Sequence, residues 1–344
     1  MTDRQLRTLV VAPNWVGDAV MSQPLLSLLR QQHPERPVDV LATAGVSPVY
    51  SAMPEVAKLI STSFEHGSLQ LGLRWKMARQ LKANGYAAAY VLPNTLKFAL
   101  LPWLAGIPLR VGYKGESRYG LINQMHHDQI PPRAMQTFYA ALAFAPTSPT
   151  PVTFPKPHME VSAARIAAVS EKFGLSAQQP RIVFAPGAEF GVAKRWPAYR
   201  FAALAAQIIK HAPQSKILLL GSGGDSATCQ EICDLEPMLQ MDNLAGKTSL
   251  EEAISLIASA HAVISNDSGL LHIASALNRP VIALYGPTDP NHAPPFSDVA
   301  SSISLHLDCA PCRQRECPLG HGNCMHQITH DTVWDKLKTM TGLR

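Results

Sequence analysis

Short apolar runs alternate along the chain with longer stretches in which apolar residues recur at helical spacing. Short apolar runs are typical of buried strands, and helical spacing is typical of helices packed on a sheet. In the first half, strands are expected at 9–11, 38–41, 59–60 and 89–92, and helices at 19–32 and 69–83. In the second half, strands are expected at 181–184, 216–220, 262–264 and 280–284, and helices at 161–173, 197–211, 249–259 and 269–277. Such alternation predicts an α/β protein with doubly wound parallel sheets.

The chain is long enough for two domains, since it has 344 residues. Residues 146–157 contain five prolines, which neither a helix nor a central strand accepts, so they are the natural linker. We expect two Rossmann-like domains, 1–150 and 151–328, facing a central cleft. A final helix in 329–344 is expected to pack back on the first domain. In open parallel sheets a ligand binds beyond the carboxyl ends of the strands, so the loops there are the informative ones.

The composition of the chain indicates a globular protein and bears on which partners it could bind. Hydrophobic residues make up 47% and charged residues 16% of the chain, as in a well-packed globular protein. The polar start and the short first apolar run favour no signal or membrane segment, and so a cytoplasmic protein. Residues 1–155 carry fourteen Lys/Arg against eight Asp/Glu, a net +6. This asymmetry suits an anionic glycolipid or an acidic membrane surface, or is simply solvated charge; nucleic acid is not expected, because no basic run is interleaved with aromatics.

Two loops of the second half carry candidate groups for a diphosphate. The loop after 181–184 contains Gly187 and Lys194, and the lysine could neutralise a leaving diphosphate. The loop after 216–220 contains Asp225, which either binds a ribose hydroxyl or caps the next helix.

The sequence Asp267-Ser268-Gly269 joins a predicted strand to a predicted helix. Free amide groups at a helix start bind phosphate, so Ser268 and Gly269 could hold a diphosphate while Asp267 accepts sugar hydroxyls. The alternative is a capped helix and nothing more. His272 either supports this loop or is a buried core histidine.

The first half offers one carboxylate and a group of cations. Asp18 begins a predicted helix, where it either caps the helix or acts as a general base. The loop before Asp18 lacks the glycine fingerprint of dinucleotide-binding domains, which argues against an NAD-dependent or nucleotide-sugar-modifying Rossmann enzyme. A candidate surface for an anionic acceptor, or an ordinary exposed loop, is formed by Asn94, Lys97, Arg110, Lys114 and Arg118.

Four of the six cysteines lie close together, at Cys309, Cys312, Cys317 and Cys324. In a cytosolic protein this density favours metal or free thiols over disulfides. The first pair has zinc-site spacing, but the later gaps are unlike the usual paired knuckles, so a structural zinc and free thiols both stay open. A purely zinc-binding interaction module is a third class of function, and it leaves the loops after the strands unexplained.

The chain resembles the ADP-heptose:lipopolysaccharide heptosyltransferases, GT-B glycosyltransferases of family 9, over nearly its whole length. The resemblance is carried by Asn14-Trp15-Val16-Gly17-Asp18 with Met21-Ser22-Gln23-Pro24-Leu25, by Pro186-Gly187-Ala188-Glu189-Phe190-Gly191 with Ala193-Lys194-Arg195-Trp196-Pro197, by Asn266-Asp267-Ser268-Gly269 and by Leu284-Tyr285-Gly286-Pro287-Thr288.

This resemblance implies an inverting transfer of L-glycero-D-manno-heptose from ADP-heptose to the first heptose of the lipopolysaccharide inner core, at the cytoplasmic face of the inner membrane. It implies Asp18 as general base and Lys194 as the stabiliser of departing ADP. It places Ser268 and Gly269 on the diphosphate and Asp267 on the heptose hydroxyls. No metal is expected for catalysis, because a fixed ammonium and helix amides can meet the developing charge. A different acceptor within the same family remains an alternative.

Overall fold

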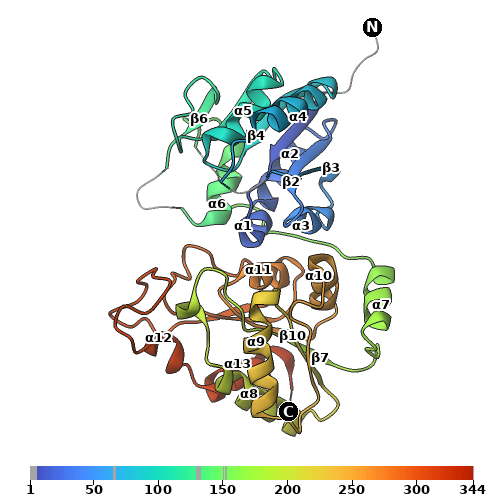
Figure 1. Cartoon of the computed structure of the whole chain (residues 1–344), viewed down its shortest axis with the longest axis vertical. Coiled ribbons are helices and arrows are strands. Elements are labelled where there is room, and N and C mark those ends of the chain that lie inside the picture. Colours follow the sequence, from blue (N-terminus) through green and yellow to red (C-terminus); the bar gives the residue numbers. More distant parts are fainter. Residues whose placement is uncertain (1–5, 65–66, 129–132, 150, 152, 344) are drawn as a thin grey trace. The chain divides into compact units, whose positions relative to one another are not determined.

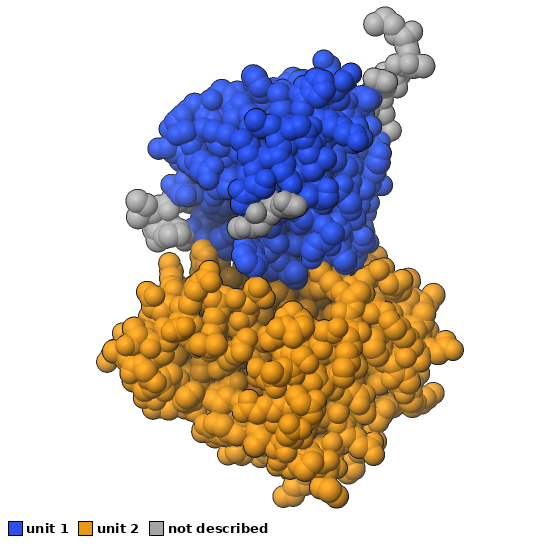
Figure 2. Space-filling view, in the orientation of Figure 1, with its two compact units in different colours: residues 1–158 blue, residues 159–344 orange. Residues whose placement is uncertain are grey.

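The computed structural model describes residues 6–64, 67–128, 133–149, 151 and 153–343, and these divide into two compact units, 1–158 and 159–344 (Figure 2). The sequence had suggested a boundary at residue 150, which itself lies outside the described residues. The observed boundary falls later because the last linker residues are bonded to the first unit. Gln136 Nε2 donates to the Pro155 carbonyl, and the His158 amide donates to Gln23 Oε1 at 3.1 Å.

Unit 1 is a parallel sheet with helices along the chain between its strands (Figure 1). Its six strands lie in the order β3-β2-β1-β4-β5-β6. The strands are β1 (Arg7–Val11), β2 (Val38–Thr43), β3 (Val56–Thr62), β4 (Tyr86–Val91), β5 (Leu109–Tyr113) and β6 (Gln124–His126). The helices are α1 (Val16–Met21), α2 (Gln23–Gln32), α3 (Ser47–Ser51), α4 (Leu71–Ala83), α5 (Leu96–Leu104) and α6 (Met135–Ala140).

Unit 2 repeats the plan with strand order β12-β11-β10-β7-β8-β9. The strands are β7 (Arg181–Ala185), β8 (Lys216–Leu219), β9 (Met241–Asn243), β10 (Ala262–Asn266), β11 (Val281–Leu284) and β12 (Ala300–Ile303). The helices are α7 (Ala163–Lys172), α8 (Ala198–His211), α9 (Ser226–Leu235), α10 (Leu250–Ala258), α11 (Gly269–Ala276), α12 (Asn323–His326) and α13 (His330–Thr341). All pairings in both sheets are parallel, as predicted.

Two expectations about helices need correction. The helix expected at 19–32 is divided into α1 and α2 at Ser22, with Pro24 in the first turn of α2, where its missing amide costs least. The final helix α13, expected on the first domain, belongs to unit 2. Its buried side chains Val333, Trp334 and Leu337 join the core beside α8. The apolar face of α13 is therefore used within unit 2.

The strand orders decide which loops lie together. In unit 2, strands β11, β10, β7 and β8 are consecutive neighbours, so their carboxyl-end loops share one edge of the sheet. In unit 1, strands β1, β4 and β5 are neighbours in the same way. These two edges carry every predicted site residue except the cysteines and the strand residue Arg110.

Candidate active site

The cation predicted to meet a diphosphate lies beside the carboxylate predicted to hold a sugar. Lys194 ends the short 3-10 helix Val192–Lys194, and its Nζ donates to Asp267 Oδ2 at 2.7 Å. Both side chains are largely buried, with 13% and 11% of their surfaces exposed. The Lys194 ammonium also lies 4.9 Å from the centre of the Phe190 ring. One ion pair thus joins the loops after β7 and β10, and an anion bound there would share the lysine with Asp267.

A buried asparagine that sequence reasoning treated only as part of a motif fixes the same two loops. Asn266 is fully buried at the end of β10. Its Nδ2 donates to the Pro186 carbonyl at 2.6 Å, and its Oδ1 accepts the Trp196 amide at 3.1 Å. The two bonds hold both ends of the segment that carries Lys194. A signal for this role was present in the sequence, since an amide at the end of an apolar strand needs buried partners.

Helix α11 begins at Gly269, two residues after Asp267. Ser268 is the N-terminal capping position with extended backbone, and its Oγ lies 3.1 Å from Ser265 Oγ. In the described residues, the Ser268 side chain makes no capping bond to the first turn of α11. The first amide groups, starting at Gly269, therefore keep their donors for an anion, which the helix dipole also favours.

His272 is buried one turn into α11. Burial lowers the pKa of His272 to about 4, while the Asp267 carboxylate raises the pKa and the Lys194 ammonium lowers it. The imidazole is therefore neutral near pH 7. This environment fits the second of the two roles considered for His272, that of a buried core histidine.

Asp225 serves the fold, but not as the predicted side-chain cap of the next helix, α9: within the described structure it makes no side-chain capping bond there, and its carboxylate instead closes the 3-10 turn Gly223–Asp225. Its Oδ2 accepts the Ser222 amide at 2.9 Å and the Ser222 hydroxyl at 2.8 Å, completing a capping box. The other oxygen of the Asp225 carboxylate, Oδ1, lies 3.6 Å from the Arg195 guanidinium. Gly187 packs against the same carboxyl group, and a Cβ built at Gly187 would lie 2.3 Å from Asp225 Cγ. Gly187 is therefore required for close approach within the protein.

Asp18 lies in unit 1, within the first turn of α1. The Tyr139 hydroxyl donates to Asp18 Oδ1 at 3.2 Å. Burial raises the pKa of Tyr139 well above its ordinary value, and Asp18, Tyr50 and Tyr113 raise it further. Tyr139 therefore stays protonated and can hold the carboxylate in place. The capping position of α1 is Trp15, so Asp18 is not the helix cap.

Arg118 does not face an acceptor, and this prediction was wrong. Its side chain is fully buried. The guanidinium donates to the Pro93 carbonyl at 2.7 Å, to the Lys114 carbonyl at 3.4 Å, to Asn94 Oδ1 at 3.4 Å and to the Tyr113 carbonyl. Arg118 therefore ties the end of β4 to the loop after β5.

Arg110 also bonds to backbone carbonyls, but it is partly exposed, so the expectation that it contacts an acceptor stays a prediction. Arg110 lies in β5, a strand that the apolar pattern did not predict. Its guanidinium donates to the carbonyls of Ile107 at 2.7 Å, Leu121 at 2.6 Å and Gly120 at 3.2 Å. Of the predicted acceptor group, Asn94 and Lys114 are exposed and Lys97 and Arg110 are partly exposed, so these four remain candidates.

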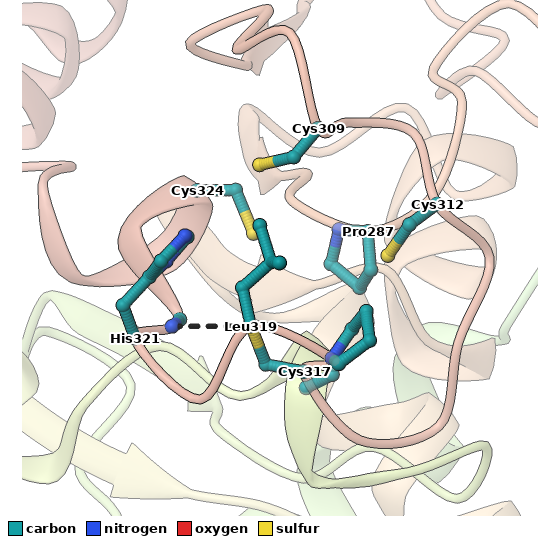
Figure 3. A pocket seen from close by; sticks show the side chains of 10 residues that line it. Pro287, Cys309, Cys312, Cys317, Leu319, His321 and Cys324 are labelled. Carbon is teal, nitrogen blue, oxygen red and sulfur yellow. Dashed lines mark hydrogen bonds between the residues drawn. The ribbon is translucent and has the colours of Figure 1, made fainter.

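The cysteine-rich segment adjoins the Lys194 loop. The four clustered cysteines and His321 line one small pocket, together with Ala193 and Pro287 (Figure 3). All six cysteines of the chain are free thiols. Across the described ranges, no three His, Cys, Asp or Glu side chains are placed so that they could hold a metal ion. None of the helices within these ranges has the length and apolar character of a membrane span.

The chain has two α/β units, each built on a parallel sheet. In the second unit, Lys194 and the first amide groups of α11 lie beyond the carboxyl ends of the strands. This combination is typical of glycosyltransferases of the GT-B class. The structure of E. coli ADP-heptose lps heptosyltransferase II is similar, with a TM-score of 0.85 and 38% identity over 98% of both chains. Lipopolysaccharide heptosyltransferase 2 of Escherichia coli K12 is 40% identical over 97% of this chain and 98% of its own length.

Lipooligosaccharide heptosyltransferase 2 of Haemophilus influenzae is also 40% identical, over 97% of this chain and 99% of its own. The sequence model of glycosyltransferase family 9 (heptosyltransferase) matches residues 74–322. The chain belongs to glycosyltransferase family 9.

Proposed function

We propose that the chain transfers L-glycero-D-manno-heptose from ADP-heptose to the first heptose of the lipopolysaccharide inner core, with inversion at the anomeric carbon. The observation that carries the proposal is the Lys194–Asp267 pair, 2.7 Å apart at the start of α11. Its support is the 40% identity to proteins named heptosyltransferase 2, which is maintained over almost the whole chain.

The donor half of the reaction needs positive charge where ADP departs. Lys194 supplies a fixed ammonium, and the amides of Ser268 and Gly269 supply oriented donors. Preorganised charge of this kind is worth several kcal/mol at a developing anion. Asp267 then exchanges part of its contact with Lys194 for the heptose hydroxyls. No metal ion is required in this scheme, so adding Mg²⁺ is expected to leave the rate unchanged.

The acceptor half needs a base for the attacking hydroxyl. Asp18 is a partly exposed carboxylate, and Tyr139 orients it from the buried side. A carboxylate can accept at more than one site, so orientation by Tyr139 is compatible with Asp18 taking the proton of an acceptor hydroxyl. The residues proposed to contact the anionic groups of the acceptor are Asn94, Lys97, Arg110 and Lys114.

ADP release tests the proposal directly. Purified protein receives ADP-heptose together with a Kdo–lipid A acceptor that carries either one heptose or none. We expect turnover only with the monoheptosylated acceptor. Turnover only with the heptose-free acceptor would reassign the acceptor within the family. If the protein binds ADP-heptose but releases no ADP with either acceptor, the proposed class of acceptor is contradicted.

We further propose that unit 1 touches the cytoplasmic face of the inner membrane through the adjoining helices α4 and α5. Trp75 and Trp103 are 55% and 48% exposed. The Arg79 guanidinium lies 4.7 Å from the Trp75 ring, and Lys76 and Lys82 are exposed on the same helix α4. Aromatic and cationic side chains together suit the interface of an anionic bilayer.

Vesicle sedimentation tests this contact. We expect binding to vesicles rich in phosphatidylglycerol and much weaker binding to phosphatidylcholine vesicles. Trp75→Glu with Trp103→Glu should lower the bound fraction several-fold without changing ADP affinity. Equal binding of this variant and the unsubstituted protein would overturn the contact and leave the transferase proposal intact.

A further inference from the structure

The cysteine-rich segment has no role in the transfer reaction described above. It runs between β12 and α12, and regular secondary structure is absent from its described residues 304–322. Figure 3 shows the four labelled cysteine side chains on different sides of one pocket. Three come from the irregular segment and one, Cys324, from α12. Four thiols drawn from a short stretch of chain around one pocket are the donor set that zinc prefers in structural sites.

The pocket is fixed to both neighbouring loops by backbone contacts. The Ala193 amide donates to the Arg315 carbonyl at 3.0 Å, and the Arg313 amide donates to the Pro287 carbonyl at 2.7 Å. At Gly191 a Cβ would lie 2.3 Å from the Arg315 carbonyl oxygen. The segment is therefore packed against the loop that carries Lys194, although it has little regular structure of its own.

One thiol already has the surroundings of a metal ligand. The Gly322 amide donates to Cys317 Sγ at 3.3 Å. Gly320 and Gly322, at φ +72° and +58°, allow the chain to turn tightly around this sulfur. Backbone amides directed at sulfur are the outer-shell contacts that orient thiolate ligands and stabilise their negative charge.

We propose that Cys309, Cys312, Cys317 and Cys324 bind one Zn²⁺ ion as a tetrathiolate. Each thiol loses its proton to solvent, four Zn–S bonds form, and no electron is transferred. The side chains as placed here do not yet form such a group, so binding requires rotation about the Cα–Cβ bonds to bring the sulfurs inward. The ion would brace the irregular segment, and through Arg315 the loop that carries Lys194.

Metal analysis and cobalt substitution test the proposal without substrate. The full chain is purified with a non-thiol reductant and without chelators, and zinc per chain is measured by plasma mass spectrometry. We expect about one zinc, released by a mercurial that blocks thiols. Co²⁺ added to the stripped protein should give the charge-transfer and d–d absorption of tetrahedral thiolate coordination, lost on adding Zn²⁺.

Two serine variants make the test specific. Cys312→Ser should lose the metal and the cobalt spectrum, whereas Cys233→Ser, a half-buried cysteine on α9, should keep both. Removing the metal should lower the Tm by at least about 5 °C, because ligands brought together by folding transfer binding energy to stability. Absence of zinc together with no cobalt spectrum in the reduced unsubstituted protein would overturn the site. A disulfide among the four cysteines, seen as fewer than six alkylated thiols when the reduced protein is denatured with a chelator before alkylation, would also overturn it.

Discussion

Cations stand among glycines in two loops of this chain, and the structure uses them in opposite ways. In unit 2, the Lys194 ammonium donates to the carboxylate of Asp267 and, at 3.5 Å, to its backbone carbonyl, and it lies over the Phe190 ring; it can exchange these partners for an anion. In unit 1, Arg118 is fully buried, and its guanidinium donates to carbonyl oxygens at the ends of both β4 and β5. The partners of each cation therefore show whether it can bind a ligand, as Lys194 can, or stabilises the fold, as Arg118 does.

The difference has a physical basis. A buried guanidinium is stable only when most of its five donors are satisfied, which suits it to collecting backbone carbonyls in an irregular loop. An ammonium on a flexible stem satisfies itself with one carboxylate and can exchange that partner for a phosphate. Loop composition alone gives the same pattern in both cases, so the partners of each cation decide its role.

The largest expected effect concerns Asp18. Asp18→Asn keeps the shape but removes the base, so kcat should fall about 10²- to 10⁴-fold. ADP-heptose affinity should stay within threefold, because Asp18 lies in unit 1, outside the donor loops. Steady-state ADP release and donor titration measure both quantities. Retention of most activity with normal donor binding would remove Asp18 from the mechanism.

Lys194→Met removes the charge that meets departing ADP. We expect a loss of roughly 10²- to 10³-fold in kcat, as for other preorganised groups at a developing anion. The Tm should also fall, because the largely buried Asp267 carboxylate is left without its partner, so kcat is compared in protein kept folded at low temperature. Lys210→Met, an exposed lysine of α8, is the matched control and should retain full activity. A loss of less than about fivefold would mean that the helix amides alone carry the diphosphate.

Arg118→Met tests the opposite half of the comparison. The substitution leaves several carbonyls unpaired, which should lower the free energy of unfolding by about 3 kcal/mol or more. Denaturant unfolding measures the loss. In folded variant protein at low temperature, kcat should stay within about twofold. A stable variant that has lost acceptor affinity would restore Arg118 to the acceptor surface.

His272 predicts how stability depends on pH. Burial lowers the pKa of His272 to about 4 from an unfolded value of 6.5, so the unfolded chain binds the extra proton between these values. Stability from this group is complete above pH 6.5 and is lost as the pH falls toward 4, by up to about 3 kcal/mol. His272→Gln should flatten this part of the curve. An unchanged slope in the variant would assign the pH dependence elsewhere.

The smallest expected effect concerns Asp225. From the sequence, two roles are possible for this residue: it caps a helix or it binds a ribose hydroxyl. Asp225→Ala removes the capping box and should cost about 1 kcal/mol of stability. ADP affinity should remain within about threefold. A tenfold loss of ADP affinity at unchanged Tm would show that Asp225 contacts the nucleotide after all.

Much of the fold could be predicted because buried parallel strands have a strong apolar signal. With the exception of β5, every strand in the interior of the two sheets was expected, from runs such as 181–184 and 262–264. The missed strands β6, β9 and β12 are three or four residues long and lie at sheet edges, where partial exposure removes the apolar pattern. Strand β5 was missed because Arg110 interrupts it.

The candidate site was predictable in unit 2 to the extent that its residues follow strands. Lys194 and Asp267 each follow a central strand, so their convergence could be expected from topology. The partners of Asn266, Arg118 and Tyr139 could not, because each bond joins segments distant in sequence. The clustering of the four cysteines was visible in the sequence, but their packing against the Lys194 loop was not.

Calorimetric titration of ADP into three proteins tests the central contrast most directly. Lys194→Met should bind ADP at least about tenfold more weakly than the unsubstituted chain, a loss of about 1.4 kcal/mol or more. Arg118→Met, kept folded at low temperature, should bind ADP with unchanged affinity. Equal affinity in Lys194→Met, or a comparable loss in Arg118→Met, would contradict the assignment of Lys194 to the ligand and Arg118 to the fold.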